Sequence, residues 1–147
     1  MGHPAGRILG IGVDLVDVAR FARVAARHDP GFVDGLFTPA EIAWCGRQRR
    51  RDEHLAARFA AREAVLKALG TGLVGLMSWR DIEVVTGEAP GLVAMEIRGA
   101  VRQVADAQGV ARVHLALATT RQVAAAAVVL EGAAHGEPCR GLDRGRS

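Results

Sequence analysis

Tyrosine is absent from this 147-residue chain, and aromatic side chains of all kinds make up only 4% of it. Surfaces that bind single-stranded nucleic acid stack bases on aromatic side chains, so the composition argues against a nucleic-acid partner. No apolar run is long enough to cross a bilayer. The apolar stretch near the N-terminus is short and interrupted by glycines and Asp14, unlike a signal peptide. We therefore expect a cytoplasmic protein with no membrane partner.

Cysteine is scarce as well, since Cys45 and Cys139 are the only two. They lie far apart without the spacing of metal ligands, so we expect free thiols. The formal net charge of +3 indicates an acidic partner, which could be nucleic acid, an anionic cofactor or an acidic protein. The length suits a single domain over residues 1–132. Residues 133–147 are polar and glycine-rich, and we expect a disordered tail there.

Lysine occurs once, at Lys67, and the rest of the 19 basic residues are arginine. Lys67 belongs to a segment, 53–69, whose composition predicts a long helix that ends at Gly70. The core-facing stripe of this helix is expected to be Leu55, Phe59, Leu66 and Leu69. Glu63 precedes Lys67 by four residues, so the two side chains lie one helical turn apart. They could form an ordinary surface ion pair, or a reactive pair built around the single ammonium group.

Residues 8–16 alternate in a way that predicts a strand. One face of this strand is apolar, and the other carries Gly10, Gly12 and Asp14. Two glycines on one face indicate that a backbone or a ligand approaches closely there. Asp14 lies at the end of this strip, where it could either cap the following helix or take part in a site.

The next segment, residues 16–28, has the periodicity of an amphipathic helix. Arg20, Arg23 and Arg27 share one of its faces, and no carboxylate lies between them in the sequence. Such a row is either a solvated face or a docking strip for an acidic surface.

The later segments predict a mixture of helices and antiparallel strands. Thr38 to Glu41 has the pattern of a capping box, which begins a short helix. The remaining elements are expected, in chain order, at 81–85 and 92–97 (a hairpin), 100–107 (a helix), and 113–118 and 123–130 (a second pair of strands).

Three stretches together resemble the holo-acyl-carrier-protein synthases, which are small 4′-phosphopantetheinyl transferases: GIGVDLVDVARF (10–21), FTPAE (37–41) and RFAAREAVLKALGTG (58–72). The resemblance extends over residues 8–131. It implies an α+β fold of the 4′-phosphopantetheinyl transferase type, with an antiparallel sheet packed against one long helix and shorter helices. It also implies that a homotrimer, with active sites between subunits, transfers the phosphopantetheine arm of coenzyme A to a serine of an apo acyl carrier protein.

The same resemblance assigns roles to residues at matching positions. Asp14 and Glu63 would bind Mg²⁺, Glu63 would accept the serine proton, and Lys67 would stabilise the leaving group, adenosine 3′,5′-bisphosphate. These three are the expected catalytic residues. Coenzyme A would contact Arg58 (at its 3′-phosphate), Lys67, Gly70, Thr71, Gly72, Thr119 and Thr120. The carrier protein would dock on Arg20, Arg23 and Arg27.

Some positions depart from the family's pattern. Thr119 stands where many relatives have a histidine that helps to hold the 3′-phosphate, whereas His114 keeps the first histidine of that motif and is expected in the core. Arg62 stands directly before Glu63, where the family usually has a lysine. It lies within the apolar stripe of the helix, so its guanidinium must reach an anion or solvent. The change at Thr119 leaves open a weakened relative that binds coenzyme A without transfer. The basic charge leaves open a non-catalytic module that binds nucleic acid or an acidic protein.

Overall fold

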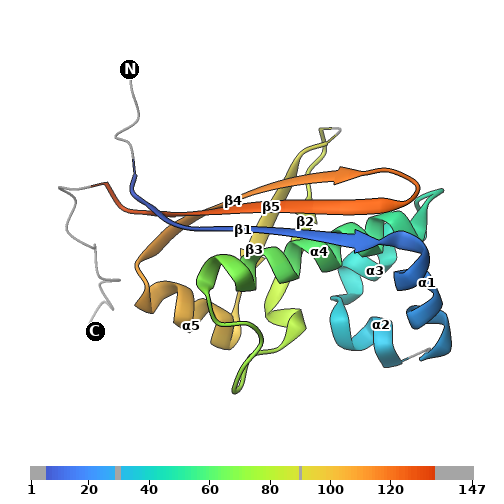
Figure 1. The fold of residues 1–147 in the computed structure, drawn as a ribbon, viewed down its shortest axis with the longest axis horizontal. Helices are drawn as coiled ribbons and strands as arrows, with labels where there is room; N and C mark the ends of the chain where they lie inside the picture. The colour runs from blue at the N-terminus through green and yellow to red at the C-terminus, as the bar shows by residue number, and fades with distance from the viewer. Residues whose placement is uncertain (1–5, 29–30, 90, 135–147) are drawn as a thin grey trace, which may run out of the picture.

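The computed structural model describes residues 6–28, 31–89 and 91–134, and Figure 1 shows how they are arranged. Three antiparallel strands form the main sheet in the order β1 (Ile8–Asp17), β5 (Val123–Gly132) and β4 (Val110–Thr119). The long helix α4 (Arg51–Leu69) lies against one face of this sheet. This is the α+β arrangement that the resemblance implied. From residue 135 onward the predicted tail, which includes Cys139, lies outside the described residues.

The glycine face of β1 is the place where α4 approaches the sheet. A Cβ atom at Gly12 would lie 1.8 Å from the carbonyl oxygen of Ala64, and one at Gly10 would lie 2.2 Å from that of Ala68. Both distances are far below van der Waals contact, so only glycine fits at either position. The two glycines predicted that a backbone or a ligand approaches this face closely, and it is the backbone of α4 that does so.

The opposite face of the sheet is apolar and open. Ile11, Val13 and Leu15 of β1 are 63%, 55% and 67% exposed. Their partners across β5 are Val129, Ala127 and Ala125. We call these six residues the open sheet face. A contiguous apolar surface of this kind usually marks a contact with another protein chain.

His114 of β4 also lies outside the core. Its side chain is 55% exposed, and its Nε2 atom lies 2.6 Å from Oε2 of Glu131 on the neighbouring strand. The pair lowers the pKa of Glu131, chiefly through this hydrogen bond. The expectation of a core histidine was wrong, because the strand turns this side chain away from α4 and toward the open sheet face.

Helix α4 is buried almost all round, since it lies between the sheet and the smaller helices. Leu55, Leu66 and Leu69 are buried as predicted, and Phe59 is half-buried. The alanines between them are buried too, which is why the helix shows no clear polar side. Gly70 ends the helix in a left-handed conformation with φ of 73°, which confirms the predicted cap.

The other elements are arranged around the long helix (Figure 1). They are α1 (Val18–Arg27), α2 (Gly31–Leu36), α3 (Pro39–Gly46), a short 3-10 helix (Trp79–Asp81), the hairpin β2 (Ile82–Thr86) and β3 (Val93–Ile97), and α5 (Gly99–Ala107). The predicted capping box begins α3, because Thr38 and Glu41 exchange side chain to backbone hydrogen bonds of 3.3 and 3.0 Å. None of the helices in the described residues is both long and apolar enough to span a membrane.

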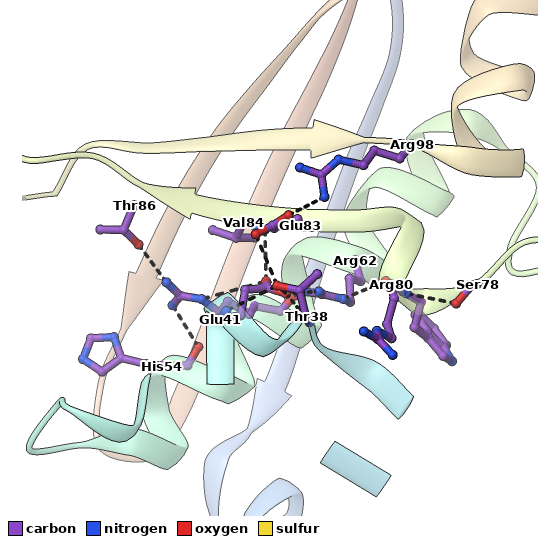
Figure 2. Close-up of polar contacts among 12 residues, drawn as sticks. Thr38, Glu41, His54, Arg62, Ser78, Arg80, Glu83, Val84, Thr86 and Arg98 are labelled. Carbon is purple, nitrogen blue, oxygen red and sulfur yellow. Dashed lines mark hydrogen bonds and ion pairs between the residues drawn. The ribbon is translucent and has the colours of Figure 1, made fainter. Parts of the chain in front are cut away.

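A buried ion pair joins α3 to α4. Arg62 has no exposed surface, and its Nη1 and Nη2 atoms donate to the two oxygens of Glu41 at 3.0 and 2.5 Å. The carboxylate of Glu41 also accepts from the backbone N–H of Val84 in β2 at 3.0 Å. One carboxylate thus ties together three elements (Figure 2). Arg62 was expected to reach an anion or solvent. The anion that it reaches is the carboxylate of Glu41, inside the protein.

Candidate active site

Asp14 and Lys67 meet where β1 crosses α4. The Nζ atom of Lys67 lies 2.6 Å from Oδ1 of Asp14 and 3.2 Å from the carbonyl oxygen of Val13. The cap of α1 is Asp17, which accepts from the backbone N–H of Arg20 at 2.7 Å. The alternative that Asp14 caps this helix is therefore wrong. Its carboxylate is left to the site that it shares with Lys67.

Lys67 is bound to Asp14 rather than to Glu63. The ion pairs formed within the described residues include Lys67 with Asp14 and none between Lys67 and Glu63, so the alternative of an ordinary surface pair at four-residue spacing is wrong. The hydrogen bond to Asp14 raises the pKa of Lys67, so its ammonium group stays charged. Its side chain is 52% exposed, which leaves it accessible to a ligand.

Glu63 lies beside Asp14, and both line one cavity of about 520 Å³. Burial raises the pKa of Glu63, the charge of Asp14 raises it further, and Lys67 acts in the opposite direction. Two acids from distant parts of the sequence therefore face one space, which Asp17 and Arg20 also line, with the ammonium group of Lys67 beside Asp14. This excess of negative charge favours either a proton or a cation.

The rest of this cavity, which we call the acid cavity, is formed mainly by α1 and its neighbours. Its floor is apolar and includes Phe21, Val24, Phe32 and Phe59, and Arg20 also lines it. Arg20 shares the exposed face of α1 with Arg23 and Arg27, as predicted. A basic surface therefore borders directly on the two acids.

Arg58 lines a different cavity, of about 500 Å³, which we call the arginine cavity. Its polar side chains come from Trp44 of α3, His54 and Arg58 of α4, Thr86 of β2 and Thr119 of β4. Arg58 is 2% exposed, and its Nη2 atom donates to the hydroxyl of Thr86 at 2.7 Å. Its guanidinium lies over the ring of Trp44, 4.3 Å from the centroid. Thr119 thus shares a cavity with Arg58, as the resemblance implied.

The two cavities lie on different sides of α4. Arg58 and Glu63 are five residues apart, which places them about 140° from each other around the helix axis. The predicted residues therefore form two groups within one chain. Asp14, Glu63 and Lys67 are together, and Arg58 and Thr119 are together, but the groups do not share a cavity.

The remaining predicted residues lie outside both cavities. Gly70, Thr71 and Gly72 form the turn that leaves α4, with Gly70 and Gly72 exposed and Gly72 at φ of 64°. Thr120 closes the turn between β4 and β5, where its hydroxyl oxygen accepts from the backbone N–H of Val123 at 3.0 Å.

Three residues of the arginine cavity were missed by sequence reasoning. His54 precedes Arg58 by four residues, so helical spacing could have placed it on the same face. Trp44 and Thr86 carry no such signal, because only the packing of α3 and β2 on α4 brings them there.

The acids suit a cation that keeps ligands from outside the protein. Across residues 6–28, 31–89 and 91–134, no three His, Cys, Asp or Glu side chains come together as a metal cage. A pair of carboxylates is the donor set that Mg²⁺ uses when phosphates and waters complete its shell.

Comparisons with known proteins show which family the chain is similar to. The model of the 4′-phosphopantetheinyl transferase superfamily matches residues 10–125. A holo-[acyl-carrier-protein] synthase of Clavibacter sepedonicus is 51% identical over 125 residues, which are 85% of this chain and 97% of the relative. The solved holo-[acyl-carrier-protein] synthase of Neisseria meningitidis is 33% identical with a TM-score of 0.77, covering 85% of this chain and 99% of that one. The enzyme of Bacillus anthracis, solved in complex with CoA (3′,5′-ADP), is 30% identical with a TM-score of 0.69, covering 86% and 98%.

Proposed function

Because this chain belongs to the 4′-phosphopantetheinyl transferase superfamily, we infer that it catalyses the holo-[acyl-carrier-protein] synthase reaction. It transfers the 4′-phosphopantetheine arm of coenzyme A to a serine of an apo acyl carrier protein and releases adenosine 3′,5′-bisphosphate. The observation that carries this inference is the meeting of Asp14, Glu63 and Lys67 at the acid cavity. Two acids and one ammonium group are the side chains that phosphoryl-type transfer needs for charge and proton handling.

Asp14 and Glu63 fit Mg²⁺ as its protein ligands. They are oxygen donors on separate elements, and a bound divalent cation would relieve their mutual repulsion, which contributes to the raised pKa of Glu63. When bound, Mg²⁺ neutralises the charge of the pyrophosphate. The protein's part is to hold the two carboxylates in place, which the packing of Gly12 on α4 does.

Glu63 is the proposed proton acceptor for the serine of the carrier protein. Burial is the main cause that raises its pKa and persists when a cation relieves the repulsion from Asp14, and a carboxylate with a raised pKa is a better base than an exposed one. Its place in the acid cavity allows it to take the proton directly or through a water molecule.

Lys67 is proposed to stabilise the leaving group. It is charged, half exposed, and held beside the cavity by Asp14. A compact ammonium group can turn from Asp14 toward phosphate oxygens without losing its charge. We propose that Gly70, Thr71 and Gly72, which follow on the same helix, contact the pyrophosphate through their backbone.

The carrier protein is proposed to dock on Arg20, Arg23 and Arg27. These side chains are exposed on one face of α1, and Arg20 also lines the acid cavity. An acidic helix bound along this row would therefore bring its serine toward Glu63. Complementary charge of this kind mainly speeds association and sets orientation.

We propose that the protein is a homotrimer and that each coenzyme A lies between two subunits. The open sheet face is an apolar surface available for such a contact. The division of the predicted residues between two cavities on different sides of α4 supports a shared site, because one subunit can bind the 3′-phosphate while the next supplies the acids. Thr119 and Thr120, close to the end of β4, are proposed to contact coenzyme A in that arrangement.

The reaction itself is tested by mass. Apo acyl carrier protein incubated with this protein, coenzyme A and Mg²⁺ should gain one phosphopantetheine group. Asp14→Asn and Glu63→Gln should abolish the gain, whereas Asp106→Asn, on an exposed face of α5, should leave it unchanged. Normal Mg²⁺-dependent turnover by either site variant would refute the assignment.

The shared site is tested by mixing two inactive variants. Subunits of Glu63→Gln and of Arg58→Gln are unfolded together and refolded as mixed trimers. If each site takes its acids from one subunit and Arg58 from the next, about one quarter of the sites recover both groups in a ring of heterologous contacts. If each site lies within one subunit, no activity returns.

A further inference from the structure

The arginine cavity carries an excess of positive charge. None of the described residues that line it is acidic, and they include one arginine and one histidine. The nearest carboxylate is that of Glu41, 3.9 Å from Nε of Arg58, and it is already bound twice by Arg62. One carboxylate therefore serves two guanidinium groups. An anion in the cavity would balance the second.

Arg58 has a free donor in this cluster. Its Nη2 atom is bound to Thr86 and its Nη1 atom donates to the carbonyl oxygen of His54 at 3.4 Å, but its Nε atom is buried without a hydrogen-bond partner in the described part of the chain. Burial of this kind lowers the pKa of Arg58 and makes an unbalanced charge costly. A negatively charged group in the cavity would offset this cost.

His54 faces the same space as Arg58. The two residues are one helical turn apart on α4, and both line the arginine cavity. In Figure 2, His54 and Thr86 lie together at one end of the polar cluster. The ring of His54 is half-buried and packs edge-on against Trp44, with 5.1 Å between the ring centroids. This contact fixes the ring at the cavity wall.

Burial and the charge of Arg58 favour the neutral form of the His54 ring in the free protein. Burial lowers its pKa, Arg58 lowers it further, and Glu53 opposes both. Glu53 is itself paired with Arg50 at 3.5 Å, and the neighbouring groups on α3 and β2, Trp44 and Thr86, carry no charge. A neutral imidazole can donate one hydrogen bond to a phosphate, and it can take up a proton once the anion is present.

We propose that His54 binds the 3′-phosphate of coenzyme A together with Arg58 and thereby takes the place of the histidine that Thr119 lacks. This rests on the proposed function, since coenzyme A is the substrate of that reaction. His54 and Thr119 approach the cavity from α4 and β4, so an imidazole from either element can reach one anion. In this chain the imidazole of the cavity thus comes from α4 and not from β4.

The test compares coenzyme A with dephospho-coenzyme A, which lacks only the 3′-phosphate. Isothermal titration should show that His54→Gln weakens coenzyme A binding about tenfold, as expected for one hydrogen bond to a charged group, and leaves dephospho-coenzyme A unchanged. His28→Gln, an exposed histidine that lines neither cavity, is the matched control and should change neither affinity. Equal loss for both ligands, or no loss for coenzyme A, would overturn the proposal.

A second substitution tests the exchange of positions. Thr119→His added to His54→Gln should recover most of the lost affinity for coenzyme A, because residue 119 lines the same cavity. Failure to recover any affinity would contradict the exchange.

A measurement on the unmodified protein covers the case in which the variants fold poorly. The nuclear magnetic resonance titration of the His54 ring should shift to a higher pKa when coenzyme A is added and should not shift with dephospho-coenzyme A. The same shift with both ligands would overturn the proposal. Failure of the proposed function is distinguished beforehand, because the unmodified protein would then leave the carrier protein without added mass.

Discussion

Removal of Arg62 should destabilise this protein more than any exposed charge does. Its guanidinium makes four hydrogen bonds, two to Glu41, one to the carbonyl oxygen of Trp79 at 3.0 Å and one to that of Arg58 at 3.1 Å. In Arg62→Met the side chain keeps similar bulk but donates none of them. Glu41, which is 2% exposed, would then be a buried carboxylate without its main counter-charge.

The cost follows from the burial of the pair. Breaking a buried ion pair by removing one partner typically costs about 3–5 kcal/mol, because the remaining charge stays desolvated. Glu41 keeps the N–H groups of Thr38 and Val84 as donors, so we expect the lower part of that range. For a domain of this size, a loss of about 3–4 kcal/mol lowers the Tm by about 10–15 °C.

Calorimetry at a fixed protein concentration measures this loss, since association with other subunits would make the Tm depend on concentration. The matched control is Arg102→Met. The Nε atom of Arg102 lies 2.8 Å from Oδ1 of Asp106, but the side chain of Arg102 is 55% exposed. An exposed pair contributes about 0.3–0.5 kcal/mol, so the control should shift the Tm by less than about 2 °C.

The double variant Arg62→Met with Glu41→Gln separates charge from packing. It removes both charges but keeps an amide oxygen that can accept from Val84. We expect it to be more stable than Arg62→Met alone by about 1–2 kcal/mol, because the buried carboxylate is gone while Arg58, 3.9 Å from it in the unmodified protein, keeps its contacts with Thr86 and the Trp44 ring. Equal stability of the double and single variants, or a loss below about 1 kcal/mol in the single variant, would refute this reasoning.

Other parts of the structure give further predictions. Gly12→Ala should unfold or strongly destabilise the protein in a thermal melt, because its Cβ would lie 1.8 Å from a helix carbonyl oxygen, whereas Gly35→Ala meets nothing within 4 Å and should be tolerated. A carbon-detected titration of metal-free protein should place the pKa of Glu63 above the usual 4.5, and Lys67→Gln should raise it further because Lys67 lowers it; a downward shift would contradict the assigned cause. Arg27→Glu, outside the acid cavity, should raise the KM for the carrier protein severalfold and leave the KM for coenzyme A unchanged. Equal changes in the two KM values would argue against docking on α1.

Most of the helices and strands were predictable because their signals are local, whereas α2 and the short 3-10 helix were not expected from the sequence. The glycine strip of β1, the cap at Gly70 and the capping box at Thr38 each depend on a few neighbouring residues, and each forms as predicted. The placement of Asp14 beside Glu63 was predicted from the order of the three family motifs, because no local sequence pattern contains it.

The remaining features depend on packing between distant elements. Spacing favoured Glu63 as the partner of Lys67, but the close approach of β1 brings Asp14 nearer. Helical periodicity could not reveal that Arg62 would meet Glu41, because their contact requires α3 to fold back onto α4. His114 was placed in the core because its strand alternates, and alternation does not say which face another element covers.

The single lysine gives this protein one amine that can be labelled selectively beside the acid cavity. Apart from an α-amino group, Lys67 is the only amine that an acylating reagent can modify, and its side chain is 52% exposed. The hydrogen bond to Asp14 raises the pKa of Lys67, so labelling is slow while that bond persists and faster in Asp14→Asn. A fluorescent label introduced through this amine therefore marks one position in every chain, and its rate of attachment reports whether the ammonium group is held by the strand.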